Sequence, residues 1–181
     1  PIDIPPILDS AGSSKFFNEI YAQIKAGTFS ENEPAYAATL IGVLENKWTT
    51  QYGQSFNAHE RAEAARLLGT FGSYEYRNYL IDAGYRINDR TVLVGIIKGI
   101  GLIAYDPDGK TLEFLKYLIA KTPHNDIDTI KAICDALEQL AKFGDNTIVS
   151  NSLYTLFSIV NGKFTNNIAK YARQKIENIV Q

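Results

Sequence analysis

The chain has 181 residues, of which 45% are apolar and 21% charged, a composition typical of a folded globular protein rather than a disordered one. Its formal net charge is −2, so it lacks the strong basic excess expected of a protein that binds nucleic acid. The single Cys excludes an internal disulfide, and no apolar run reaches the roughly 18 residues that a membrane span requires.

The N-terminus carries information about processing. Residue 1 is Pro and the sequence contains no Met, so we expect a processed form, an excised domain or a trimmed chain whose N-terminal targeting context is missing. Residues 1–57 hold six acidic side chains against three basic ones, whereas residues 58–181 hold fourteen against fifteen. We therefore predict a soluble protein without a membrane span and leave its compartment open.

The first 57 residues are predicted to form an extended segment and then two helices. Residues 1–12 are rich in proline and are expected to be extended. Apolar residues at spacings of three and four predict a helix over 14–25 and another over 30–48, with Ser30 as N-cap and Glu33 as its capping-box partner. We interpret residues 13–57 as an N-terminal helix pair or capping repeat that ends in a polar loop.

Helical periodicity is more regular in the remaining residues. It predicts helices over 58–71, 74–82, 89–105, 110–121, 127–143, 147–160 and 166–180, separated by short breaks rich in turn residues such as Gly, Asn and Asp. Connections this short predict that successive helices are antiparallel.

Every second helix repeats the same pattern. Leu68, Ile100, Leu140 and Ile176 take equivalent positions, at successive offsets of 32, 40 and 36 residues, and a small or apolar residue stands four positions before each of them. Glycines that directly follow the first two members, Gly69 and Gly101, are expected to let helices pass closely. A period near 36 residues predicts a solenoid of helix pairs.

Three segments carry a family resemblance: residues 63–72 (EAARLLGTFG), 95–103 (GIIKGIGLI) and 132–140 (AICDALEQL). Small residues followed by a Leu-Gly-like step resemble the first helix of the HEAT-like repeat family. The resemblance implies an all-α fold, a right-handed α-solenoid of antiparallel helix pairs over residues 58–181. The entry to each first helix departs from the family pattern, so the subfamily stays open.

Candidate chemical sites are few. His59 and His124 are 65 residues apart, and no second His follows His59 at zinc-protease spacing. The stretch Asp106–Gly109 is expected to be a helix-capping turn, because a calcium loop beginning at Asp106 would place Tyr117 where a bidentate Glu is needed. Cys134 lies on the apolar face of its helix and is expected to be a small buried hydrophobe. We therefore predict no metal site, no cofactor and no catalysis.

Aromatic residues give the clearest functional hypothesis. Second helices of HEAT-like pairs line the concave surface, so the resemblance implies a ridge of aromatic and basic side chains there. The candidate partner-binding residues are Tyr76, Arg77, Phe114, Lys116, Tyr117, Tyr154 and Phe157. Tyr and Arg are enriched among interface anchors. The alternative is that these aromatic side chains fill the space between repeats.

The favoured hypothesis is a non-catalytic protein-binding or scaffolding module with a protein or peptide partner. Two alternatives stay open. One is a HEAT-like protein resembling the phycobilin lyase group, which handles a tetrapyrrole. The other is nucleic-acid binding, as in the HEAT-like DNA glycosylases, which the near-neutral charge disfavours.

Overall fold

The computed structural model describes residues 33–47 and 55–181, together with residues 18, 22, 26 and 27. The regular structure of these residues is helical, without strands. The helices are α2 (Glu33–Leu44), α3 (Ala58–Thr70), α4 (Tyr74–Arg86), α5 (Arg90–Ile103), α6 (Lys110–Lys121), α7 (Ile127–Phe143), α8 (Asn146–Val160) and α9 (Asn166–Val180). The all-α prediction is confirmed for this part of the chain, and none of its helices is long and apolar enough to cross a membrane.

The predicted helices from residue 58 onward all form, with one clear difference in length. Helix α4 continues to Arg86, although the sequence analysis ended it at Asp82 because of Gly84. Three predictions lie outside the described residues: the extended segment 1–12, most of the helix over 14–25 and the Ser30 cap. Helix α2 corresponds to the second helix of the predicted N-terminal pair.

Short polar side chains fix where most helices begin. The Asn57 side chain accepts a hydrogen bond from the Glu60 backbone N–H at 2.8 Å, and the Glu60 carboxylate accepts one from the Asn57 N–H at 3.2 Å, which completes a capping box. Asp89 and Asp145 cap α5 and α8 through their carboxylates in the same way. At the other end of α5, Ala104 adopts a left-handed conformation (φ 51°) that stops the helix.

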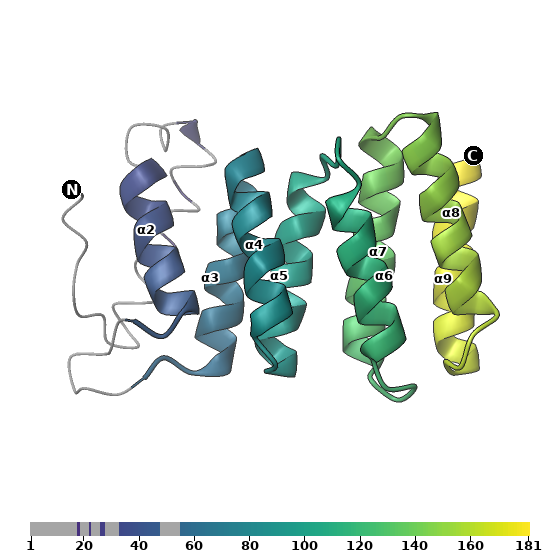
Figure 1. Cartoon of the computed structure of the whole chain (residues 1–181), viewed down its shortest axis with the longest axis horizontal. Helices are drawn as coiled ribbons and strands as arrows, with labels where there is room; N and C mark the ends of the chain where they lie inside the picture. Colours follow the sequence, from purple (N-terminus) through teal and green to yellow (C-terminus); the bar gives the residue numbers. More distant parts are fainter. Residues whose placement is uncertain (1–17, 19–21, 23–25, 28–32, 48–54) are drawn as a thin grey trace.

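The helices from α3 to α9 lie in two layers (Figure 1). One layer contains α3, α5, α7 and α9, each packed against the next, and we call these the odd helices. The other contains α4, α6 and α8, the even helices, which contact one another and cover the odd layer. Helix α2 packs against α3 at the N-terminal end.

The equivalent positions found in the sequence lie in the hydrophobic core. Leu68, Ile100, Leu140 and Ile176 are all buried, and so are the four residues that precede them by one turn. The glycines allow the helix backbones to touch: a Cβ atom on Gly69 would lie 2.2 Å from the Gly99 carbonyl oxygen, and one on Gly95 would lie 2.3 Å from that of Ala62. The expectation of close helix packing at glycines is confirmed for α3 and α5.

Candidate functional site

Four of the predicted partner-binding residues are exposed on two neighbouring even helices. Lys116 and Tyr117 lie on α6, and Tyr154 and Phe157 on α8; we call these four residues the aromatic surface. Tyr154 is 81% exposed, Phe157 49% and Tyr117 39%, although all three are large apolar side chains. A surface hollow of about 240 Å³ lies between α6 and α8, and its lining includes Lys116 and Tyr154.

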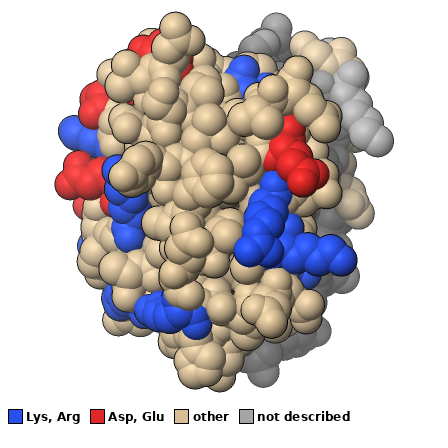
Figure 2. All heavy atoms as spheres, turned by 90° about the vertical axis from the view of Figure 1, so that its right-hand side faces the viewer, with Lys and Arg blue, Asp and Glu red and all other residues tan. Residues whose placement is uncertain are grey.

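The charge around this surface is uneven. Helix α8 contains no charged residue, and the interval between Asp145 and Lys163 is free of charge. Figure 2 views the molecule from the α8–α9 end and shows a broad uncharged area with Lys, Arg, Asp and Glu side chains gathered toward its sides. The exposed rings of α8 therefore lie on a helix whose own side chains are all uncharged.

Tyr85 extends the aromatic surface to α4. It is 44% exposed, and the centroid of its ring lies 5.0 Å from that of Tyr117. The ammonium of Lys121 lies 5.6 Å from the Tyr117 centroid, within range of a cation–π contact. Tyr85 was missed because the sequence analysis placed it in a break after Gly84, whereas α4 continues through it.

Arg77 does not belong to this surface, and the prediction that it faces a partner is wrong. It is fully buried, with its guanidinium 2.8 Å from both the Asp106 and the Asp108 carboxylates. The Asp106 carboxylate also accepts hydrogen bonds from the backbone N–H groups of Thr111 and Leu112 at 2.9 and 3.0 Å. The turn predicted at 106–109 does cap α6, and in addition it supplies the acids that hold Arg77.

Phe114 is likewise buried, against the prediction that it is an exposed partner-binding residue. Its ring lies over Gly84 of α4, where a Cβ atom would come within 2.3 Å of its Cζ atom. Tyr85 covers the same ring edge-on at 5.0 Å. Because Gly84 has no side chain, the two helices come close enough to enclose the ring, and Phe114 is a packing residue.

Tyr76 is half-buried. Its ring lies 5.9 Å from that of Phe71, and burial together with a hydrogen bond to Glu33 raises the pKa of its phenol to about 12. It joins α4 to the N-terminal helices, so for this residue the structure agrees with the alternative that aromatic side chains fill space between repeats.

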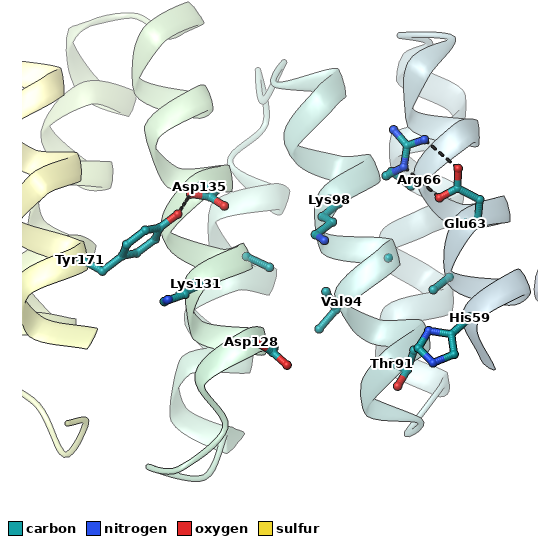
Figure 3. A pocket seen from close by; sticks show the side chains of 13 residues that line it. His59, Glu63, Arg66, Thr91, Val94, Lys98, Asp128, Lys131, Asp135 and Tyr171 are labelled. Carbon is teal, nitrogen blue, oxygen red and sulfur yellow. Dashed lines mark hydrogen bonds and ion pairs between the residues drawn. The ribbon is translucent and has the colours of Figure 1, made fainter. Parts of the chain in front are cut away.

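A larger hollow, which was not predicted, lies on the other layer (Figure 3). It has a volume of about 590 Å³ and we call it the odd-helix groove. Its lining residues are His59, Ala62, Glu63 and Arg66 of α3; Thr91, Val94, Gly95 and Lys98 of α5; Asp128, Lys131, Ala132 and Asp135 of α7; and Tyr171 of α9. The sequence analysis proposed no binding site on this face of the odd helices.

Two sets of contacts organise the charges of the groove. Glu63 and Arg66 form an ion pair one turn apart on α3, at 2.8 Å. The Tyr171 hydroxyl donates a 2.5 Å hydrogen bond to the Asp135 carboxylate, which also lies 3.1 Å from the Lys175 ammonium. Burial and the contact with Asp135 raise the pKa of Tyr171 to about 12, so its hydroxyl stays a donor at neutral pH.

The remaining titratable candidates form no chemical site. His59 and His124 are exposed on different helical units, and no group of three potential metal ligands occurs among the described residues. Cys134 is completely buried, and burial raises the pKa of its thiol to about 12. A thiol with these properties is a poor nucleophile at neutral pH, which agrees with the expectation of a small buried hydrophobe.

Comparisons with known proteins give one sequence relative. An uncharacterised protein of Treponema pallidum (strain Nichols) is 29% identical over 163 residues, which cover 90% of this chain and 31% of that protein. The chain thus spans about a third of the length of this relative. No family model and no solved structure matches the chain.

Proposed function

We propose that this chain is a non-catalytic protein-binding or scaffolding module, a right-handed α-solenoid of antiparallel HEAT-like helix pairs, whose partner docks on the aromatic surface. The observation that carries the proposal is the exposure of Tyr117, Tyr154 and Phe157 on two neighbouring helices. These rings take little part in the core, so they are available to a partner.

The layered packing supports the solenoid. Each odd helix packs against the next odd helix, and the equivalent apolar residue of each odd helix is buried. In a repeat protein each unit buries its apolar face against its neighbours. The resemblance of residues 63–72, 95–103 and 132–140 to the first helix of HEAT-like pairs falls on three of the four odd helices.

The composition and shape of the aromatic surface support a protein partner. Tyr154 and Phe157 are three residues apart on α8 and so lie on one face of it. Aromatic side chains are enriched at the centres of protein interfaces, where a few anchors supply most of the binding energy. The adjoining hollow between α6 and α8 would accept an apolar side chain, and Lys116 at its edge would pair with an acidic one.

The experiment compares proteins captured from the source organism by immobilised wild type and by the double variant Tyr154→Ser/Phe157→Ser. A matched control, Tyr105→Ser/Phe143→Ser, changes residues of the same types that are 59% and 65% exposed outside the aromatic surface. Bound proteins are quantified by mass spectrometry, and the thermal midpoint of each variant is measured.

The proposal predicts that at least one protein is retained by wild type and control but lost by the Tyr154/Phe157 variant, with unchanged thermal midpoints. Loss of an anchor weakens binding by about 2 kcal/mol or more, roughly thirtyfold in affinity. Identical captured sets from all three proteins would contradict the proposal. A large fall in the midpoint of the Tyr154/Phe157 variant would instead identify these rings as packing residues.

A further inference from the structure

We propose that the odd-helix groove is a second binding site and that it takes an acidic, extended segment of a protein. This inference goes beyond the proposed function, because the groove is lined by α3, α5, α7 and α9, whereas the aromatic surface lies on α6 and α8. The two sites therefore share no residue.

The floor of the groove is lined by small residues. Its lining includes one small residue from each of three neighbouring odd helices: Ala62, Gly95 and Ala132. A second hollow of about 410 Å³ shares Arg66, Lys98, Ala132 and Asp135 with the first, so the depression continues along the odd helices. An open, elongated depression of this kind suits a chain segment better than a small molecule, which needs an enclosing pocket.

Most acidic side chains of the groove are already occupied by partners within the chain. Glu63 pairs with Arg66, and Asp135 holds both Tyr171 and Lys175. Glu138, just beyond the groove, accepts from Lys175 at 3.2 Å and from the Asn178 amide at 2.7 Å. These carboxylates therefore have less negative charge to offer a ligand.

Two lysines in the middle of the groove form no close ion pair with a described carboxylate. Among residues 33–47 and 55–181, no carboxylate lies within 4.0 Å of the Nζ atom of Lys98 or Lys131. Both side chains are exposed; Lys131 instead lies 5.3 Å from the centroid of the Tyr171 ring. Figure 3 shows Lys98 on α5 and Lys131 on the neighbouring α7, with Asp128 one turn before Lys131 at the lower end of the groove. Two available ammonium groups on adjacent helices would pair with two carboxylates of one ligand.

The same geometry sets the length and the apolar content of the segment. Packed helices lie about 8–10 Å apart, and an extended chain rises about 3.3 Å per residue, so a segment that crosses the groove from α3 to α9, over three interhelical distances, needs about seven to nine residues. Leu102, which is 51% exposed in the adjoining hollow, offers an apolar contact at one end. We therefore expect acidic residues in the centre of the segment and an apolar residue near one end.

The test uses a fluorescein-labelled peptide of about ten residues, composed of Glu, Gly and a terminal Leu, titrated with the protein and followed by fluorescence anisotropy. The same peptide with each Glu replaced by Gln measures the charge requirement. Wild type is compared with Lys98→Gln/Lys131→Gln, and the matched control is Lys110→Gln/Lys142→Gln, which removes two exposed lysines of α6 and α7 that line neither the groove nor the aromatic surface.

The expected result is saturable binding of the Glu peptide that weakens as salt rises and is about tenfold weaker in the Lys98/Lys131 variant, because two exposed ion pairs are lost. The control should change affinity by less than about twofold. A further variant, Lys98→Arg/Lys131→Arg, keeps both positive charges and should bind the Glu peptide as wild type does. It tests the charge requirement even if the Gln variant proves unstable.

Three results would overturn the inference. Absence of saturable binding would exclude the site, and equal weakening by the control would show general attraction to lysines. Inorganic phosphate at moderate ionic strength could also displace the Glu peptide completely while chloride at the same ionic strength does not. That result would show a simple anion site instead of a peptide site. None of these results bears on the aromatic surface, so failure here is distinguishable from failure of the proposed function.

Discussion

The contact between α3 and α5 allows a sharp test of the fold, through the substitution Gly69→Ala. In this contact the two helix backbones touch: an added Cβ at Gly69 would lie 2.2 Å from the carbonyl oxygen and 2.4 Å from the Cα atom of Gly99. Both atoms belong to backbone, so no side-chain rotation can relieve the overlap. The helices would have to separate by about 1 Å, since an ordinary carbon–oxygen contact is about 3.4 Å or more.

The free energy of unfolding should fall despite a local gain. Ala stabilises a helix interior by about 1 kcal/mol relative to Gly, whereas overpacking a core contact costs about 1–3 kcal/mol and occasionally more. A gap of about 1 Å would also remove a quarter to a half of the dispersion energy between facing atoms, here between α3 and α5. We expect a net loss of about 2 kcal/mol, which for a chain of this size lowers the thermal midpoint by about 4–8 °C.

Circular dichroism during thermal unfolding measures the change, and Gly101→Ala provides the matched control on α5. A Cβ atom there would lie 3.3 Å from the Ala136 Cα atom, which requires a shift of only a few tenths of an ångström, so the midpoint should stay within about 2 °C of wild type. If Gly69→Ala were as stable as wild type or more stable, the close approach of α3 and α5 would be refuted.

Three further substitutions or measurements test the core and the buried ion pairs. Cys134 should react slowly with a thiol reagent in the native protein and rapidly after unfolding, because it is fully buried with a pKa of about 12; rapid native labelling would contradict its burial. Leu140→Ala should lower the free energy of unfolding by about 2–5 kcal/mol and exposed Lys142→Ala by less than about 0.5 kcal/mol, as measured by chemical denaturation, and equal effects would exclude Leu140 from the core. The Arg77 guanidinium, through its hydrogen bonds, holds the pKa of Asp108 well below its usual range, so the stability that this pair contributes is present above about pH 4 and lost as the pH falls through the folded-state pKa. Asp108→Asn should therefore flatten the acid side of the curve of thermal midpoint against pH, and an unchanged curve would show that the pair contributes nothing measurable.

The helices were predictable because local rules determine most of them. Periodicity and turn residues gave every helix from α3 to α9, and capping residues such as Asn57 and Asp89 mark their starts. The error at α4 has a specific cause. Gly84 was interpreted as a helix break, but it is needed inside the helix for the Phe114 ring, and this requirement comes from a residue 30 positions away.

The candidate surfaces were only partly predictable for the same reason. Exposure of Tyr117, Tyr154 and Phe157 follows from their position on the helix face away from the core. Burial of Arg77 depends on two acids in a distant turn that sequence analysis interpreted only as a cap. The odd-helix groove combines polar residues of four helices, each of which is ordinary on its own helix, so no single stretch of sequence indicates it.

Site-specific photo-crosslinking tests the central claim, that the aromatic surface binds a protein, most directly. A photoreactive phenylalanine analogue replaces Tyr154, and in a second protein it replaces Lys170, an exposed residue of α9. Both proteins are expressed in the source organism and irradiated. The proposed function predicts a discrete protein adduct from position 154 and none from position 170. Adducts that are the same at both positions, or that arise only at position 170, would contradict it.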